Sequence, residues 1–239
     1  MSNNANKLSL LGHIGELRTR LIRSVIALAM AVAICFVFYP ELFAILLFPA
    51  RDISLIRTEM TEMLSTAMKV AITGGFILVM PYLTYEFIMF VSPALTAREK
   101  RYVFLILPWI VLMFIAGVTF TYFILLPPMI NFLLNFGGDI AAPQIRVSNY
   151  ISLVTRLLLA FGLIFEAPVV TTFLARIGVL KPEWLAGKRK PAIIIAFILS
   201  AIITPTIDPV NQSLVAVPLI MLYEMSIWLA KLVHKRRAD

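Results

Sequence analysis

Three glutamates lie at positions where a carboxylate could form an ion pair, stabilise the start of a helix, or act within the membrane. Glu16 lies in a short amphipathic segment before the first apolar run, four residues before Arg20. The simplest role for Glu16 is therefore an ion pair across one helical turn, which stabilises a helix by about 0.2–0.5 kcal/mol. Glu99 is a lone acid among three bases, where its charge would favour the start of a helix.

The third acid, Glu166, lies inside a long apolar run. Placing a carboxylate at the centre of a bilayer costs at least about 2.5 kcal/mol, so such a group should face protein or water. An interhelical hydrogen bond would satisfy it without any further role. We nevertheless favour a functional role, because intramembrane acids commonly mark functional sites.

Other reactive groups are scarce. Neither a GxxxxGK[ST] nor a GxGxxG pattern occurs, so no nucleotide-binding loop is expected. Cys35 is the only cysteine, which excludes an internal disulfide and a cysteine metal site. His13 and His234 lie outside the apolar runs and cannot hold a haem within the bilayer. The sequence therefore predicts no catalytic residues, no metal and no cofactor.

The composition is that of a membrane protein. Apolar residues make up 61% of the 239 positions and charged residues 14%, and the mean hydropathy is +0.93. No polar stretch is large enough to form a separate soluble core, so we expect one membrane domain over residues 1–239. The net charge of +8 falls in clusters at the ends of apolar runs, which favours membrane orientation over nucleic-acid binding. We see no removable signal peptide.

Six apolar runs are candidate spans. A hydrocarbon core about 30 Å thick needs about 20 helical residues, and four runs meet that length easily. The fifth is short, with 14 residues. The predicted spans are 21–38, 67–91, 102–126, 151–177, 191–204 and 210–230.

The distribution of basic residues supports the short fifth span. With six spans, fifteen lysines and arginines lie with both termini on one side of the membrane, and three (Arg51, Arg57 and Arg146) lie on the other. The positive-inside rule then places both termini in the cytoplasm. Without the fifth span, the basic residues of segment 231–237 would lie outside. A short span that still crosses implies local thinning of the bilayer or tilted neighbours.

Prolines within the spans should bend them, because each removes a backbone donor. The two long outer connections, 39–66 and 127–150, should form loops with short helices that cap the outer mouth.

Five short motifs occur in chain order. The first is HIGELRTRL at 13–21, which contains Glu16, and the second is FVSPALTAREKR at 90–101, which contains Glu99. The others are 161–168, the hairpin 204–212, and 223–224. Together with the topology, these motifs resemble the TatC family, the multispanning subunit of the twin-arginine protein translocase, over residues 10–232.

The resemblance implies a receptor without enzymatic activity in the cytoplasmic (inner) membrane. It would bind the twin-arginine signal peptides of folded precursor proteins at the cytoplasmic face, and the proton gradient would drive export. In this family the acids matching Glu16 and Glu99 form the signal-peptide site. The positions carried over to that site are Glu16, Arg18, Phe90, Pro93, Leu95 and Glu99.

The resemblance also implies a concave, glove-like arrangement of six helices, with the carboxyl of Glu166 facing the hollow. Single-span partners of the TatA and TatB type would dock on the short fifth and sixth helices, near Thr204, Gln212 and Glu224. Self-association in a larger complex is expected. One departure concerns the signal site: Glu86 stands where family members often carry glutamine, although its position near a span end would also let it reach the interface.

Two other classes of protein remain as alternatives. A small-solute or ion transporter could use Glu166 as a proton or cation site, but paired broken helices in two matching halves would be expected and are not visible. A membrane enzyme would need a catalytic constellation that the sequence does not show.

Overall fold

A computed structural model describes residues 2–50, 55–91, 97–136, 144–204 and 208–238. Five of its helical segments are long and apolar enough to cross a membrane: Ile14–Val37, Glu62–Phe90, Phe104–Asn135, Val147–Ile177 and Pro209–Val233. These segments correspond to five of the six predicted spans. The prediction of a mostly helical protein with several apolar helices long enough to span a membrane is confirmed.

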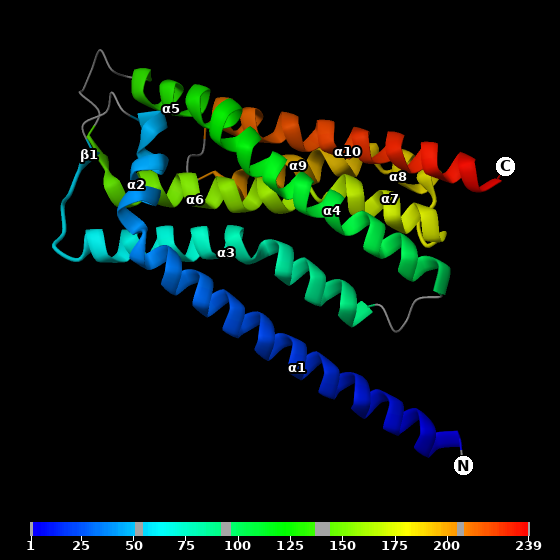
Figure 1. The fold of residues 1–239 in the computed structure, drawn as a ribbon. Coiled ribbons are helices and arrows are strands. Elements are labelled where there is room, and N and C mark those ends of the chain that lie inside the picture. The colour runs from blue at the N-terminus through cyan, green and yellow to red at the C-terminus, as the bar shows by residue number, and fades with distance from the viewer. Residues whose placement is uncertain (1, 51–54, 92–96, 137–143, 205–207, 239) are drawn as a thin grey trace.

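The described residues form mainly α-helices, joined by short turns and two short strands (Figure 1). The α-helices are α1 (Ser2–Val37), α2 (Tyr39–Leu47), α3 (Glu62–Val91), α4 (Ala97–Phe120), α5 (Leu126–Asn135), α6 (Val147–Ile164), α7 (Ala167–Ile177), α8 (Pro182–Gly187), α9 (Arg189–Ile203) and α10 (Pro209–Ala238). Between them lie the 3-10 turn η1 (Phe48–Ala50), the π-helical segment η3 (Thr121–Leu125) and the strands β1 (Leu55–Ile56) and β2 (Ile145–Arg146).

The predicted fifth span corresponds to α9, which has 15 residues. At 1.5 Å per residue its length is about 22 Å, less than the roughly 30 Å of a hydrocarbon core. It is therefore not among the five segments that qualify as spans by length. A crossing at α9 rests on the distribution of charge.

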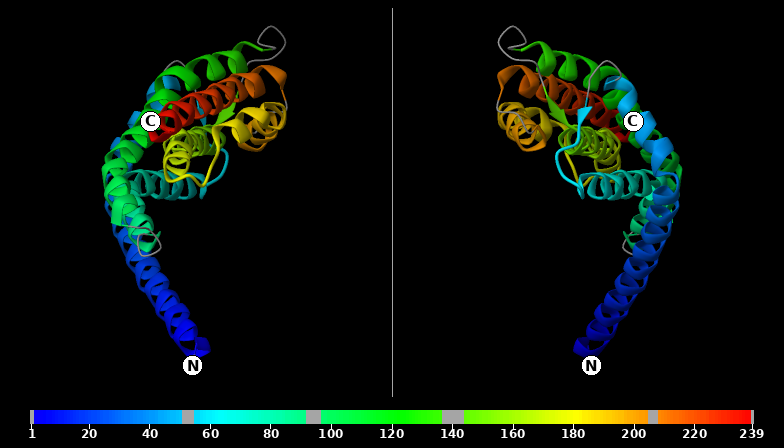
Figure 2. Two further views of the ribbon diagram at one scale, coloured as in Figure 1. Left: turned by 90° about the vertical axis from the view of Figure 1, so that its right-hand side faces the viewer. Right: turned by 90° about the vertical axis from the view of Figure 1, so that its left-hand side faces the viewer.

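Helix α1 is continuous, so the amphipathic segment around Glu16 is the first part of the same helix that forms the first span. It packs against α3 (Figures 1 and 2), and the two helices approach closely at Gly75. A Cβ atom at position 75 would lie 2.8 Å from the backbone nitrogen of Val32. Only glycine permits that approach, which fixes α1 against α3.

The connection predicted to begin at Pro127 differs from the expectation. Helix α4 continues through η3 into α5, so the third helical segment extends to Asn135. Pro127 and Pro128 cannot donate to the preceding turn, and a π-helical segment just before them accommodates the missing bonds within a continuous helix. The prolines therefore mark a bulge rather than the end of the helix.

The fourth segment is broken where Pro168 predicts a bend. Helix α6 ends at Ile164, a turn contains Phe165 and Glu166, and α7 begins at Ala167. Pro168 has no N–H for the carbonyl of residue 164, which explains the break at this point. Glu166 is thus placed at the end of a helix rather than along its side.

The core lies around α6, which packs against α3, α4 and α9 (Figure 1). Its crossing with α4 is close, since a Cβ atom on Gly162 would lie 2.6 Å from the ring of Phe114. The fully buried side chains of the core include Val70, Leu126, Met129, Ile151, Val154, Leu157, Phe161 and Val215.

At the end of the molecule opposite the termini, a two-stranded parallel pair joins β1 to β2, with Leu55 opposite Ile145. Glu62 holds this end together. Its carboxylate accepts hydrogen bonds from the backbone N–H of Thr58 at 2.8 Å and of Ser148 at 3.0 Å. Glu62 is 4% exposed, so one buried acid ties the start of α3 to the start of α6.

Candidate functional site

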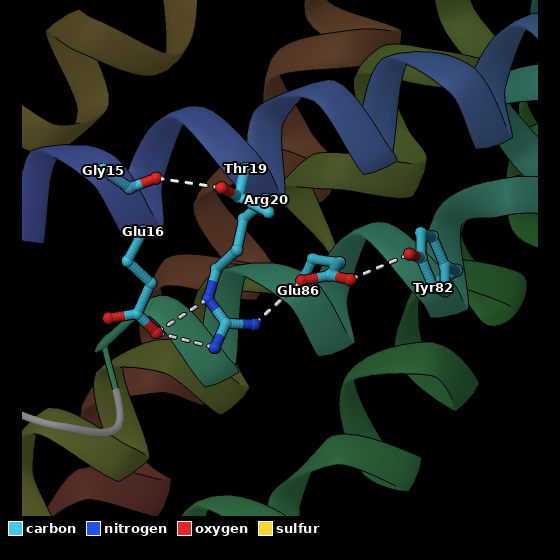
Figure 3. Close-up of polar contacts among 6 residues, drawn as sticks. All are labelled: Gly15, Glu16, Thr19, Arg20, Tyr82 and Glu86. Carbon is cyan, nitrogen blue, oxygen red and sulfur yellow. Dashed lines mark hydrogen bonds and ion pairs between the residues drawn. The ribbon is translucent and has the colours of Figure 1, made fainter.

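An arginine on α1 lies between two glutamates from two different helices (Figure 3). The Arg20 guanidinium donates from Nε at 3.0 Å and from Nη2 at 2.7 Å to Oε1 of Glu16. Its third nitrogen, Nη1, donates to Oε2 of Glu86 on α3 at 2.9 Å. All three guanidinium nitrogens are therefore engaged, and the predicted pair of Glu16 with Arg20 is present.

Glu86 is the most enclosed member of this cluster. Its side chain is 6% exposed, against 32% for Glu16 and 17% for Arg20. The Tyr82 hydroxyl donates to Oε1 of Glu86 at 2.8 Å, one helical turn earlier on α3 (Figure 3). A buried carboxylate needs such partners, because an unpaired charge out of water is strongly unfavourable.

The sequence places Glu86 near a span end, from which its side chain could reach the interface. Two features of the sequence indicate it: the departure from the glutamine common in the family, and the spacing of Tyr82 and Glu86 at i, i+4. Glu86 and Arg20 are 66 residues apart in the sequence. They meet because α1 packs on α3.

The other predicted signal-peptide residues are placed as follows. Arg18 is exposed on α1, and Phe90 is half-buried in the last turn of α3. Glu99 is the third residue of α4, although its side chain lies outside the described part, as do Pro93 and Leu95. The start of α4 and the N-terminal half of α1 lie at the same end of the molecule (Figure 1).

Glu166 lines a cavity of about 480 Å³ between α3, α4 and α7. Apart from Glu166 and Thr84, its walls are apolar: Phe76, Met80, Leu83, Phe87, Ile88, Ile106, Ile110, Val170, Phe173 and Leu174. Oε1 of Glu166 and Oγ1 of Thr84 are both buried, with no hydrogen-bond partner among the described residues. An interhelical hydrogen bond to this oxygen, the simpler alternative, is therefore not present in the described part of the chain.

Of the predicted docking residues, Thr204 directly follows α9, and Gln212 and Glu224 lie on α10. Ser200 donates to the carbonyl of Gln212 at 2.6 Å, and Nε2 of Gln212 donates to the carbonyl of Phe197 at 3.1 Å. Thr204 is buried and donates to the carbonyl of Ser200 at 2.8 Å. The contacts of Ser200 and Gln212 thus join α9 to α10 within this chain.

Glu224, the third docking candidate, is held by Arg189 in a two-point ion pair. The Nε to Oε1 distance is 2.7 Å and the Nη2 to Oε2 distance is 2.9 Å. Both side chains are about half exposed. The ion pair joins the first residue of α9 to the C-terminal half of α10.

Comparison with known proteins gives a consistent result. The model of the Sec-independent protein translocase protein (TatC) family matches residues 12–218. A TatC from Aquifex aeolicus is 41% identical, over 95% of this chain and 96% of its own. A TatC from Carboxydothermus hydrogenoformans is 38% identical, over 96% of this chain and 95% of its own.

The fold agrees with the sequence. A crystal structure of the twin-arginine translocase receptor TatC superposes with a TM-score of 0.83 at 42% identity, covering 92% of this chain and 99% of that one. A second crystal structure, of the same receptor in the detergent DDM, gives a TM-score of 0.84. The chain belongs to the TatC family of Sec-independent protein translocase proteins.

Proposed function

We propose that this chain is the receptor subunit of a twin-arginine translocase, and that Glu16 and Glu99 bind the two arginines of a signal peptide. The observation that carries the proposal is the contact of Arg20 with Glu16. Two guanidinium nitrogens meet one carboxylate oxygen at 2.7 and 3.0 Å, so the site around Glu16 accommodates a guanidinium group. The ammonium group of lysine cannot reproduce these planar, two-point contacts of a guanidinium.

The direct test is binding of two peptides to the purified full chain in lipid nanodiscs. One peptide carries two adjacent arginines before an apolar segment, and the other carries two lysines in their place. We expect the arginine peptide to bind at least about tenfold more tightly, because planar charge-assisted hydrogen bonds are lost with lysine. Equal affinities at the same ionic strength would contradict the proposal.

We further propose six spans in a glove-like arrangement in the cytoplasmic membrane, with both termini in the cytoplasm. The two termini lie at the same end of the molecule (Figure 1), as an even number of spans requires. The excess of basic residues at that end supports its cytoplasmic position. The sixth crossing would be α9, whose short length a locally thinned bilayer can accommodate.

Cysteine labelling tests this topology. In a Cys35→Ser background, a membrane-impermeant maleimide should label Met60→Cys in intact spheroplasts, because Met60 is 97% exposed at the opposite end. Ser9→Cys and Ala238→Cys should react only after the membrane is opened. Labelling of Ala238→Cys in intact spheroplasts would require an odd number of spans and would reject the topology.

The partners we propose are single-span subunits of the TatA and TatB type, together with further copies of this chain. Helix α9 presents an apolar face at i, i+4 spacing, on which Ile194, Ile198 and Ile202 are 61%, 55% and 67% exposed. Within the membrane such a face suits lipid or another apolar helix. A partner helix there would lie beside Thr204 and Gln212.

For Glu166 we propose a role after first recognition of the precursor. Glu166→Ala should reduce export by about tenfold or more while changing peptide affinity by less than about threefold, since its unpaired oxygen faces an apolar cavity and not the Arg20 cluster. Export assays and peptide titrations measure the two effects separately. Thr84→Val is the matched control for loss of the other unpaired polar atom. An equal loss of peptide binding and export in Glu166→Ala would contradict this division.

A further inference from the structure

Arg20 binds the carboxylate of Glu16, which we assign to the binding of an arginine of the signal peptide. Both contacts of Arg20 to Glu16 go to Oε1, in the manner expected of an incoming guanidinium. The receptor therefore carries its own arginine in the place where the ligand's arginine would bind. Any precursor that uses Glu16 must compete with it.

Glu86 gives Arg20 a second acid on a different helix. The contact from Nη1 to Oε2 of Glu86 is 2.9 Å, and it does not involve the nitrogens that meet Glu16. Glu86 is itself fixed by Tyr82 and is nearly buried. Arg20 can thus release Glu16 and still keep a carboxylate partner (Figure 3).

We propose that Arg20 is a resident competitor for the signal-peptide site, and that Glu86 retains Arg20 when a precursor arginine displaces it from Glu16. The proposal rests on the proposed function, because it assumes that Glu16 binds the precursor. Its consequence is a lower affinity for every cationic group that binds Glu16, because each must displace the same Arg20 guanidinium.

A purely structural role for the same contacts makes a different prediction. If Arg20 served only to clamp α1 to α3, removing either Arg20 or Glu86 would loosen the site and weaken binding in both cases. Competition predicts opposite signs. Without Arg20, the arginine of the ligand no longer competes with a resident guanidinium for Glu16. Without the Glu86 charge, displaced Arg20 has no acid to move to and holds Glu16 more firmly.

The experiment measures binding of the arginine and lysine peptides to the full chain in nanodiscs. Arg20→Gln should tighten the arginine and the lysine peptide alike, by about threefold, because both are relieved of the same competitor. Glu86→Gln should weaken the arginine peptide by about tenfold. The Arg20→Gln/Glu86→Gln double variant should bind like Arg20→Gln, because no resident arginine is left to retain. Tyr82→Phe, which leaves both acids in place, should lie between wild type and Glu86→Gln.

Two outcomes distinguish a failure of the competitor role from a failure of the proposed receptor function. If Glu16→Gln weakens the arginine peptide but Arg20→Gln weakens it as well or leaves it unchanged, the competitor role is wrong and the receptor function stands. If Glu16→Gln leaves binding of the arginine peptide unchanged, the assignment of Glu16 itself fails. Monodisperse gel filtration of each variant shows that a loss of binding does not come from unfolding.

Discussion

Replacing both Glu16 and Glu99 by glutamine is expected to reduce crosslinking of a twin-arginine precursor by at least about 100-fold, because each arginine loses a charge-assisted partner. Glutamine keeps the size and polarity of the side chain, so the protein should still insert in the membrane. Glu99→Gln alone should have the larger effect. Glu16 already forms an ion pair with Arg20. Binding a precursor arginine at Glu16 therefore replaces an existing contact, and the net gain in binding free energy is smaller.

The control is Glu183→Gln, which removes an exposed acid from the first turn of α8. It changes the net charge by the same amount as either single variant, and crosslinking should stay at the wild-type level. If the double variant at positions 16 and 99 crosslinks as well as the control, these two acids do not form the signal-peptide site.

The second large effect is expected at Glu62, far from the proposed site. Glu62→Ala should lower the thermal unfolding temperature in detergent by about 5 °C or more, because the backbone N–H groups of Thr58 and Ser148 would be left without their acceptor. Circular dichroism during heating measures the shift. Glu62→Gln keeps one carbonyl oxygen and should give an intermediate value.

Glu41→Ala is the matched control, since Glu41 is an exposed acid in the first turn of α2. Its unfolding temperature should stay within about 1 °C of wild type, as is usual for surface substitutions. A shift in Glu62→Ala no larger than that of the control would mean that Glu62 does not join α3 to α6 in solution.

Hydropathy predicted the long helices well because a span needs a run of apolar residues that few other structures require. It failed where the third helix continues beyond its apolar run. The prolines at 127 and 128 suggested the end of a helix, yet η3 carries the helix past them. For α9, the predicted bounds 191–204 agree with the helix at Arg189–Ile203, and its short length follows from its short apolar run.

The candidate site was predictable in its local contacts. The pair of Glu16 with Arg20 follows from i, i+4 spacing alone, and the break beside Glu166 follows from Pro168. Two contacts depend on packing and were not predictable. Arg20 reaches Glu86 only because α1 crosses α3 closely at Gly75, and Glu224 meets Arg189 only because α9 folds back on α10.

The central claim is that the arginine pair of a precursor binds between Glu16 on α1 and Glu99 at the start of α4. A photoreactive residue placed next to that pair in a full-length precursor tests it most directly, with the attachment site in this chain identified by mass spectrometry. We predict attachment within about one helical turn of Glu16 or Glu99, and loss of that attachment in the double glutamine variant. Attachment confined to the opposite end of the molecule, near β1 and β2, would contradict the claim.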